Sequence, residues 1–341
     1  MRNRSCLLVV CSGSLLGLFA FAAGAVDRAL ALGSRALCAA YAGVPEGFGR
    51  IAHAGMVWIA EGEFTPGSQQ GYAEERGGEA AQVAGFWIDR TEVTNAQFAR
   101  FVAATGYVSA AERVGAAPVF HKPAAAEVAA RDYAWWRLVP GADWRHPQGP
   151  ASSSAGKPNQ PVVQVSHADA LAYAHWLGHS LPSEMQWEYA AKAHRDDSAL
   201  HHEPRDAQGK PSANFWQGEF PTKNTLQDGF ETSAPVGCYA PNSFGLFDML
   251  GNVWEWTGSR YTSSHRAQDS YGDSAADSGG HAAGDESCSA SASSGSRLTL
   301  KGGSFLCAAN YCARYRVAAR HAQEADQPAM HIGFRTVSVT P

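Results

Sequence analysis

The chain has little charge, few cysteines and no long basic stretch. Of its 341 residues only 17% are charged, and the formal net charge is −5, so nucleic acid is not an expected partner. Beyond the N-terminal region only Cys238, Cys288, Cys307 and Cys312 remain. These are too few for a disulfide scaffold in a domain of this size, so its stability must come from an apolar core. A hydrophobic content of 45% is typical of such a globular protein.

The first 35 residues have the features of an export signal. Arg2 and Arg4 precede an apolar run over residues 7–25, and Ala23-Gly24-Ala25 has the small-residue pattern of a cleavage site. An uncleaved anchor is the alternative, because the run is nearly long enough to span a bilayer. We therefore expect an exported protein, periplasmic or secreted. Residues 1–35 would be its signal peptide or N-terminal anchor, and residues 36–341 its mature domain.

Short helices and strands separated by loops are predicted along the mature domain. Strand composition occurs at residues 56–59 and 85–89. Helix-capping patterns predict helices that begin near Thr94, Ser166 and Ser183, the first two ending at Gly106 and Gly178.

A low-complexity insertion is predicted at residues 262–297, which are rich in Ser, Ala, Gly and Asp. His265, His281 and Cys288 lie within it, and we expect them to be solvated and without a role. The remaining pattern of elements indicates a single α+β domain.

Two cysteines near the C-terminus, Cys307 and Cys312, are the first candidates for chemistry. Spacing alone favours a structural disulfide in an exported protein. Arg314, Arg316 and Arg320 nearby favour the thiolate form instead, and the flexible pair Gly302-Gly303 is typical of substrate-binding loops. Two thiolates are also a soft ligand set that selects Cu(I). From the sequence spacing, both a structural disulfide and a metal-binding thiolate pair remain possible.

Oxygen-donor side chains gather in three segments, residues 214–219, 228–230 and 248–255. Asn, Asp and Glu side chains with loop carbonyls are the ligands that Ca²⁺ prefers. The same residues form ordinary turns, and spacing alone favours turns.

Several motifs together resemble the formylglycine-generating enzyme (sulfatase-modifying factor) family. The resemblance extends over about residues 54–337, and its specific part is Cys307-x-x-x-x-Cys312 followed by Arg314-Tyr315-Arg316, the pattern of the aerobic active members. Its other motifs are Met56-Val-Trp-Ile59, Glu92-Val-Thr-Asn95, Trp144-Arg-His-Pro147, Pro161-Val-Val-Gln-Val-Ser166, Leu181-Pro-Ser-Glu184, Trp187-Glu-Tyr189, Gly251-Asn-Val-Trp-Glu-Trp256, Lys301-Gly-Gly-Ser304 and Gly333-Phe-Arg335.

The resemblance implies a fold, an activity and a set of site residues. The fold would be the formylglycine-generating-enzyme variant of the C-type-lectin-like fold, in a monomer. The activity would be copper-dependent, with O₂ as co-substrate, and would convert a cysteine in a Cys-x-Pro-x-Arg-like segment of an unfolded sulfatase to Cα-formylglycine. Cu(I) would bind between Cys307 and Cys312, with Ser304, Tyr311 and Arg314 beside them. The implied Ca²⁺ ligands are Asn214, Phe215, Asp228 and Phe230 for one ion, and Asp248, Gly251, Val253 and Glu255 for the other.

The chain also departs from the family. Ala308 and His331 replace a histidine and an asparagine of animal members, and the two disulfides of those members are absent, with Ala174 and Thr336 at one pair of positions and Ala191 and Val317 at the other.

Two other functions remain open from the sequence. One is a calcium-stabilised binding module with a structural Cys307–Cys312 disulfide, and the other is an oxidase of a different thiol. His146 and His167 are interpreted as structural residues rather than metal ligands.

Overall fold

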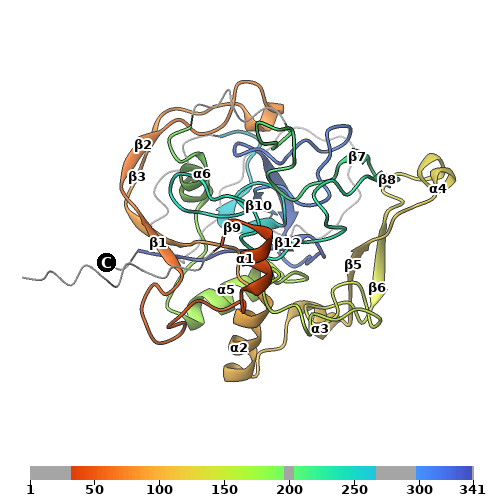
Figure 1. Cartoon of the computed structure of the whole chain (residues 1–341), viewed down its shortest axis with the longest axis horizontal. Coiled ribbons are helices and arrows are strands. Elements are labelled where there is room, and N and C mark those ends of the chain that lie inside the picture. The colour runs from red at the N-terminus through yellow and green to blue at the C-terminus, as the bar shows by residue number, and fades with distance from the viewer. Residues whose placement is uncertain (1–31, 196–202, 266–296, 340–341) are drawn as a thin grey trace, which may run out of the picture.

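The computed structural model describes residues 32–195, 203–265 and 297–339 (Figure 1). Its helices are α1 (Arg35–Ala40), α2 (Asn95–Thr105), α3 (Ala110–Val114), α4 (Ala125–Ala130), α5 (His167–Trp176) and α6 (Glu184–Lys192), with a 3₁₀ turn at Ala73–Glu75. Its strands are β1 (Met56–Ile59), β2 (Gly62–Phe64), β3 (Ala81–Val83), β4 (Phe86–Asp89), β5 (Ala116–Phe120), β6 (Trp136–Pro140), β7 (Gly218–Glu219), β8 (Lys223–Asn224), β9 (Trp254–Arg260), β10 (Arg297–Lys301), β11 (Arg320–Glu324), β12 (Ile332–Gly333) and β13 (Val337–Ser338).

The three helices predicted from capping patterns are confirmed. Thr94, Ser166 and Ser183 are the N-caps of α2, α5 and α6, and each side-chain oxygen accepts a hydrogen bond from a backbone N–H in the first turn. Gly106 ends α2 with a φ of 70°, a left-handed conformation that glycine adopts without strain. The predicted strands are β1 and β4, which pair antiparallel. Mixed helices and strands with long loops confirm the α+β fold class.

A four-stranded sheet with the order β11-β10-β9-β12 occupies the centre of the domain. β10 pairs antiparallel with both β11 and β9, whereas β12 runs parallel to β9. A second sheet, β1-β4-β13, joins the N-terminal part of the domain to the last strand. Large aromatic side chains from both ends of the chain fill the main core, among them Phe98, Tyr173, Trp256 and Phe334. This arrangement brings the C-terminal cysteine region against the centre of the fold.

The β5–β6 hairpin projects from one edge of the domain and has α4 at its tip (Figure 1). This arm was not predicted from the sequence. Trp135, which immediately precedes β6, returns to the domain and packs edge-on against Phe220 and Tyr311, with ring centroids 5.3 Å apart in both pairs. The arm therefore contributes aromatic side chains to the region around the cysteine pair.

The N-terminal segment is linked covalently to the domain by a disulfide between Cys38 in α1 and Cys238. This pairing was missed, because Cys38 stood outside the four cysteines counted for the domain. The packed structure also begins a few residues before the expected boundary at 36, since the Gly33 N–H donates to Gly237 O over 2.7 Å. Residues 1–31, which hold most of the expected leader, lie outside the described residues.

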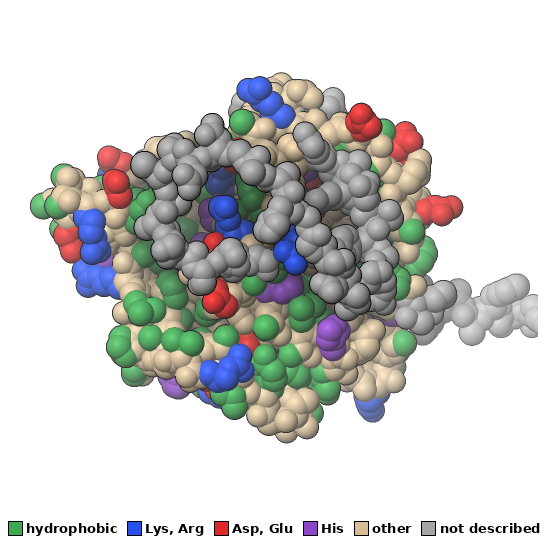
Figure 2. Space-filling view, turned by 180° about the vertical axis from the view of Figure 1, so that it is seen from behind, with side chains coloured by type: hydrophobic (Ala, Val, Ile, Leu, Met, Phe, Trp, Pro, Cys, Tyr) green, Lys and Arg blue, Asp and Glu red, His purple; other side chains and the backbone are tan. Residues whose placement is uncertain are grey.

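Within the described ranges, no helix is long and apolar enough to cross a membrane. On the face shown in Figure 2, Lys and Arg side chains are interspersed with acidic and apolar ones, in line with the balanced composition. Residues 266–296 of the predicted insertion also lie outside the described part of the chain. His265 does not, and it is buried, so our expectation that it is solvated was wrong.

Candidate functional site

The two predicted thiols lie together. The Sγ atoms of Cys307 and Cys312 are 3.3 Å apart, and both cysteines are free. A disulfide bond would need a separation of ~2.05 Å. Cys307 is fully buried in the main core, and Cys312 is partly exposed. The pair is therefore in hydrogen-bond contact as two separate thiols.

A tight loop between β10 and β11 holds this pair. The Cys307 N–H donates to Ser304 O over 2.9 Å, and the Cys312 N–H donates to Ala308 O over 3.0 Å. Gly303 has a φ of +78°, and a Cβ added to it would lie 2.5 Å from Arg314 O. Only glycine lets the two sides of this loop approach so closely. Gly303 thus closes the loop that carries both cysteines, whereas the sequence had suggested a substrate-binding loop for the Gly302-Gly303 pair.

The two thiols differ in acidity. Burial and the hydrogen bond to Cys312 raise the pKa of Cys307 well above its usual value. The hydrogen bond from Cys307 lowers the pKa of Cys312, and the positive charge of Arg314 lowers it further. Cys307 is therefore the protonated donor, and Cys312 is the sulfur on which negative charge gathers.

Arg314 is the only one of the three predicted arginines that acts on the cysteines. It also pairs with Glu74, and its guanidinium lies over the Tyr72 ring. Arg316 pairs with the buried Glu75, and Arg320 makes a bidentate pair with Glu184. All three arginines are thus paired with carboxylates, and Arg314 is the one whose charge is seen to lower the pKa of Cys312.

A cavity of about 360 Å³ opens onto the two sulfurs. Ser304 and Tyr311, the other predicted residues, also line it. Tyr311 stacks on Phe220 with ring centroids 4.5 Å apart, and together with Trp135 they form an aromatic cluster at the cavity. Two histidines, His321 and His331, line the cavity as well. The cavity can accommodate an extended polypeptide so that one side chain of that polypeptide lies at the two sulfurs.

The first predicted calcium set is brought together and fits a hard cation. The Asn214 Oδ1 atom is buried and has no hydrogen-bond partner within the described ranges, although the nitrogen of the same amide donates two hydrogen bonds. Gln217 Nε2 donates to Phe215 O and, over 2.6 Å, to Asp228 Oδ2. Phe230 N donates to Asp228 Oδ1 over 3.0 Å, which places its carbonyl in the same loop. An orphaned oxygen beside a carboxylate is a suitable donor set for Ca²⁺.

The second predicted set adjoins the first. Buried carboxylates of Asp248, Glu255 and the unpredicted Glu92 face one guanidinium, that of Arg335, which binds Glu255 through two hydrogen bonds of 2.7 Å. Burial, and then the charges of Asp248 and Glu255, raise the pKa of Glu92 well above its usual value, and its Oε2 meets no N–H donor among the described residues. This local excess of negative charge also fits a hard cation.

Backbone geometry connects the two calcium sets. Gly251 has a φ of +74°, and a Cβ there would lie 2.1 Å from Asn214 O. Gly251 and Val253, predicted as carbonyl ligands, therefore belong to a loop that packs directly on Asn214.

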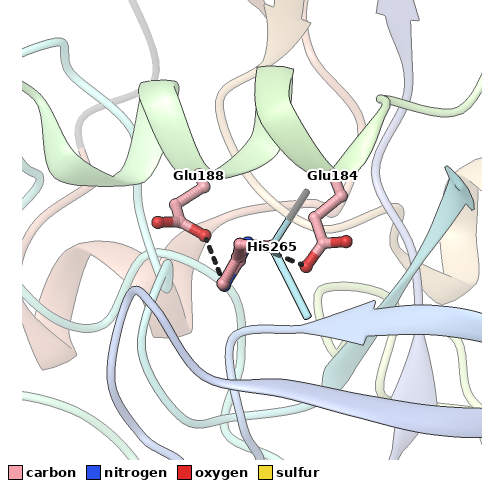
Figure 3. A group of neighbouring side chains, drawn as sticks. All are labelled: Glu184, Glu188 and His265. Carbon is pink, nitrogen blue, oxygen red and sulfur yellow. Dashed lines mark ion pairs between the residues drawn. The ribbon is translucent and has the colours of Figure 1, made fainter. Parts of the chain in front are cut away.

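A further group of ligand-type side chains consists of Glu184, Glu188 and His265. Figure 3 shows both glutamates projecting from α6 on either side of the imidazole. The His265 nitrogens lie 3.9 Å from Glu184 Oε1 and 3.8 Å from Glu188 Oε2. Arg320 already binds Glu184, and Lys301 donates to Glu188 over 2.8 Å. The two carboxylates are thus neutralised by side-chain cations, so this group is a structural ion cluster rather than a site for a divalent metal.

His146 and His167 take no part in any metal-ligand group found among the described residues. His146 lies 3.3 Å from Asp143 in its loop, and His167 packs edge-on against Trp256.

Together, the observed fold and site define an α+β domain of the C-type-lectin-like class with two free thiols at an aromatic cavity. Residues 41–340 match the sulfatase-modifying factor enzyme 1-like domain family. The formylglycine-generating enzyme of Mycobacterium tuberculosis is 42% identical over 298 residues, which cover 83% of this chain and 97% of that protein. The formylglycine-generating enzyme of Thermomonospora curvata is 41% identical over 294 residues, which cover 82% of this chain and 92% of that protein.

The chain belongs to the formylglycine-generating enzyme (sulfatase-modifying factor) family, as its motifs indicated. The solved structure of PvdO from Pseudomonas aeruginosa shares the fold, with a TM-score of 0.51 and 23% identity over 83% of this chain and 93% of PvdO. That likeness concerns the fold alone.

Proposed function

We propose that this protein converts a cysteine of a sulfatase polypeptide to Cα-formylglycine. The observation that carries the proposal is the pair of free thiols, Cys307 and Cys312, 3.3 Å apart at a cavity large enough for a peptide segment. The relatives with about 40% identity over most of both chains are named formylglycine-generating enzymes, which supports the same activity here.

Cys307 and Cys312 would hold Cu(I), because two sulfurs form a soft donor set. The lowered pKa of Cys312 favours its thiolate form, which is the form that binds a metal. Bound copper would supply a soft acceptor for the substrate thiol and the means to reduce O₂. Arg314 stabilises negative charge on Cys312. Tyr311 and the aromatic cluster around it would bind the peptide and exclude water from the sulfurs. Ser304 fixes the loop, because its hydroxyl accepts from the Leu306 N–H over 3.2 Å.

The electron count requires one further reactant. Conversion of a CH₂–SH group to an aldehyde removes two electrons and releases the sulfur as H₂S, with water supplying the aldehyde oxygen, and reduction of O₂ to two molecules of water takes four electrons. An external thiol reductant would supply the other two electrons and become a disulfide.

Two further parts of the proposal concern calcium and location. Ca²⁺ bound by the two adjoining oxygen-rich sets would stabilise loops that have little regular secondary structure. Export from the cytoplasm is supported by the Cys38–Cys238 disulfide, because such bonds persist in oxidising compartments.

The test is an assay of the purified full chain with Cu(I), O₂, a thiol reductant and a Cys-x-Pro-x-Arg peptide. Mass spectrometry should detect the aldehyde, and Cys307→Ser and Cys312→Ser should each abolish both Cu(I) uptake and aldehyde formation without loss of fold. Full activity of either variant would rule out the thiol pair as the catalytic centre. Conversion of a small thiol but of no peptide would favour the alternative, an oxidase of a different thiol.

A further inference from the structure

The cavity at the thiol pair is lined, among the described residues, without any Asp, Glu, Lys or Arg. Besides the aromatic cluster, its lining includes a polar strip made of His321, Gln323, Gln327 and His331. The two glutamines are neutral, so the charge of the strip depends on the two histidines.

Both histidines are neutral near pH 7. Burial, followed by the charge of Arg314, lowers the pKa of His321 to about 4. Burial, followed by the proximity of His321, lowers the pKa of His331 to about 3. The strip therefore offers hydrogen bonds but no charge.

The structure fixes the orientation of His321. Arg314 Nη1 lies 3.3 Å from His321 Nδ1. A guanidinium can only donate, so Nδ1 accepts and the single ring hydrogen of neutral His321 is on Nε2. That nitrogen is not fully buried and has no hydrogen-bond partner among the described residues, so its N–H is available to a ligand in the cavity.

Trp254 contacts both histidines, His321 through its ring and His331 through the backbone. Its ring stacks on His321 with centroids 5.6 Å apart, and its backbone N–H donates to His331 O over 2.8 Å. The His331 ring packs on Trp136, with 4.9 Å between centroids, and its Nδ1 is buried without a hydrogen-bond partner in the described part of the chain. An unpaired N–H is rarer in protein interiors than an unpaired acceptor, which favours the hydrogen on Nε2 here too.

The histidines are not placed as further metal ligands of the thiol pair. Among the described residues, no group of three that includes either cysteine has its donor atoms within 4.8 Å of one another. Among the described residues, the two imidazoles therefore do not complete a three-ligand metal site with the sulfurs.

We propose that His321 and His331 are substrate-positioning residues whose N–H groups bind backbone carbonyls of the substrate peptide, and that the cavity selects a cysteine flanked by uncharged residues. This inference rests on the proposed function, because it takes the ligand to be a cysteine peptide. Carbonyl oxygens are the acceptors that every extended peptide presents, whatever its side chains. A charged side chain next to the substrate cysteine would lose hydration against the aromatic cluster and the neutral strip, and neither of them offers it a counter-charge.

The first experiment measures binding of a peptide whose reacting cysteine is replaced by serine, so that no turnover is needed. Fluorescence anisotropy with the full chain should show about fivefold weaker binding for His321→Leu and for His331→Leu, as expected for one neutral hydrogen bond each. His321→Gln and His331→Asn keep a neutral N–H donor and should restore most of the affinity. His175→Leu, on the exposed side of α5, is the matched control and should bind as wild type.

The second experiment measures turnover of cysteine peptides that differ only beside the cysteine. In His321→Leu the KM should rise about fivefold while kcat changes less than twofold. For the wild-type protein, a peptide with Asp at a flanking position should have a KM more than tenfold above that of the same peptide with Asn there. The same difference is expected for a peptide with Lys compared with one with Gln.

These outcomes separate the inference from the proposed function. Equal peptide binding by the wild type and both leucine variants would refute the claim that His321 and His331 bind the substrate peptide. If the KM rises for only one sign of flanking charge, the claim that the cavity selects uncharged flanking residues is refuted. If the leucine variants bind the peptide more weakly but no peptide yields an aldehyde, the peptide-binding role of the two histidines is supported and the formylglycine activity is refuted. If His321→Leu does not fold by circular dichroism, His331→Leu and its asparagine rescue decide the question.

Discussion

Replacing Cys38 and Cys238 by serine should lower the stability of the protein strongly. The disulfide joins residues 200 positions apart in the sequence. In the chain-entropy treatment, closing a loop of about 200 residues in the unfolded chain stabilises the folded state by about 5 kcal/mol. Engineered and native disulfides often contribute less than this value, so we expect a loss of about 2–5 kcal/mol in the free energy of unfolding.

The loss should be visible in calorimetry. For a domain of this size each kcal/mol changes the Tm by about 2 °C, so the double serine variant should melt about 4–10 °C below the wild type. Reductant should lower the Tm of the wild type by a similar amount. Cys307→Ser/Cys312→Ser is the matched control, since it keeps the disulfide and should retain the response to reductant. A double variant of Cys38 and Cys238 that melts within about 1 °C of the wild type would refute the reasoning.

Three other perturbations test separate parts of the site. Removing the Arg314 cation in Arg314→Met should raise the pKa of Cys312, so that the pH profile of its alkylation by iodoacetamide moves to higher pH; an unchanged profile would refute that pairing. Burial raises the pKa of Glu188, but Lys301 and the other cations around it outweigh burial and lower this pKa from 4.5 to about 2, so the pair stabilises the fold above pH 4.5 and loses about 3 kcal/mol as the pH falls toward 2. Glu188→Gln should be destabilised by about 3 kcal/mol at pH 7 and show a weaker acid dependence in urea titrations; wild-type stability at pH 7 would contradict this. Removal of calcium with EGTA should lower the Tm, with restoration by Ca²⁺ but not Mg²⁺, whereas a melting curve unchanged after prolonged chelation would argue against both sets.

Local signals were sufficient for the elements that sequence reasoning predicted correctly. The capping boxes at Thr94, Ser166 and Ser183 are decided by residues three apart, so a single short segment contains the information. The same is true of Cys307 and Cys312, which one tight loop brings together.

Long-range packing explains what was missed. Nothing near Cys38 indicates that its partner is Cys238, because that pairing depends on how the whole chain folds. Arg316 and Arg320 are close to the cysteines in sequence, but their carboxylate partners, Glu75 and Glu184, come from distant segments. Sequence proximity therefore overstated the positive charge at the thiols.

The polar strip shows the same limitation. His331 was noticed as a departure from the family, but its tertiary surroundings determine that it is neutral and faces the cavity. For His321, no sequence motif indicated the contact with Arg314 that determines which ring nitrogen carries the hydrogen. A histidine's charge and tautomer depend on neighbours that only the folded structure reveals.

The most direct test of the account is the state of the two sulfurs in the working protein. Purified wild-type protein should take up one Cu(I) per chain, show two copper–sulfur bonds by X-ray absorption, and convert the peptide cysteine to an aldehyde under O₂ with a thiol reductant. Loss of Cys307 or Cys312 should remove the copper signal and the aldehyde together. A permanent disulfide between these cysteines in protein that still forms the aldehyde, or copper bound as described with no peptide converted, would contradict the central claim.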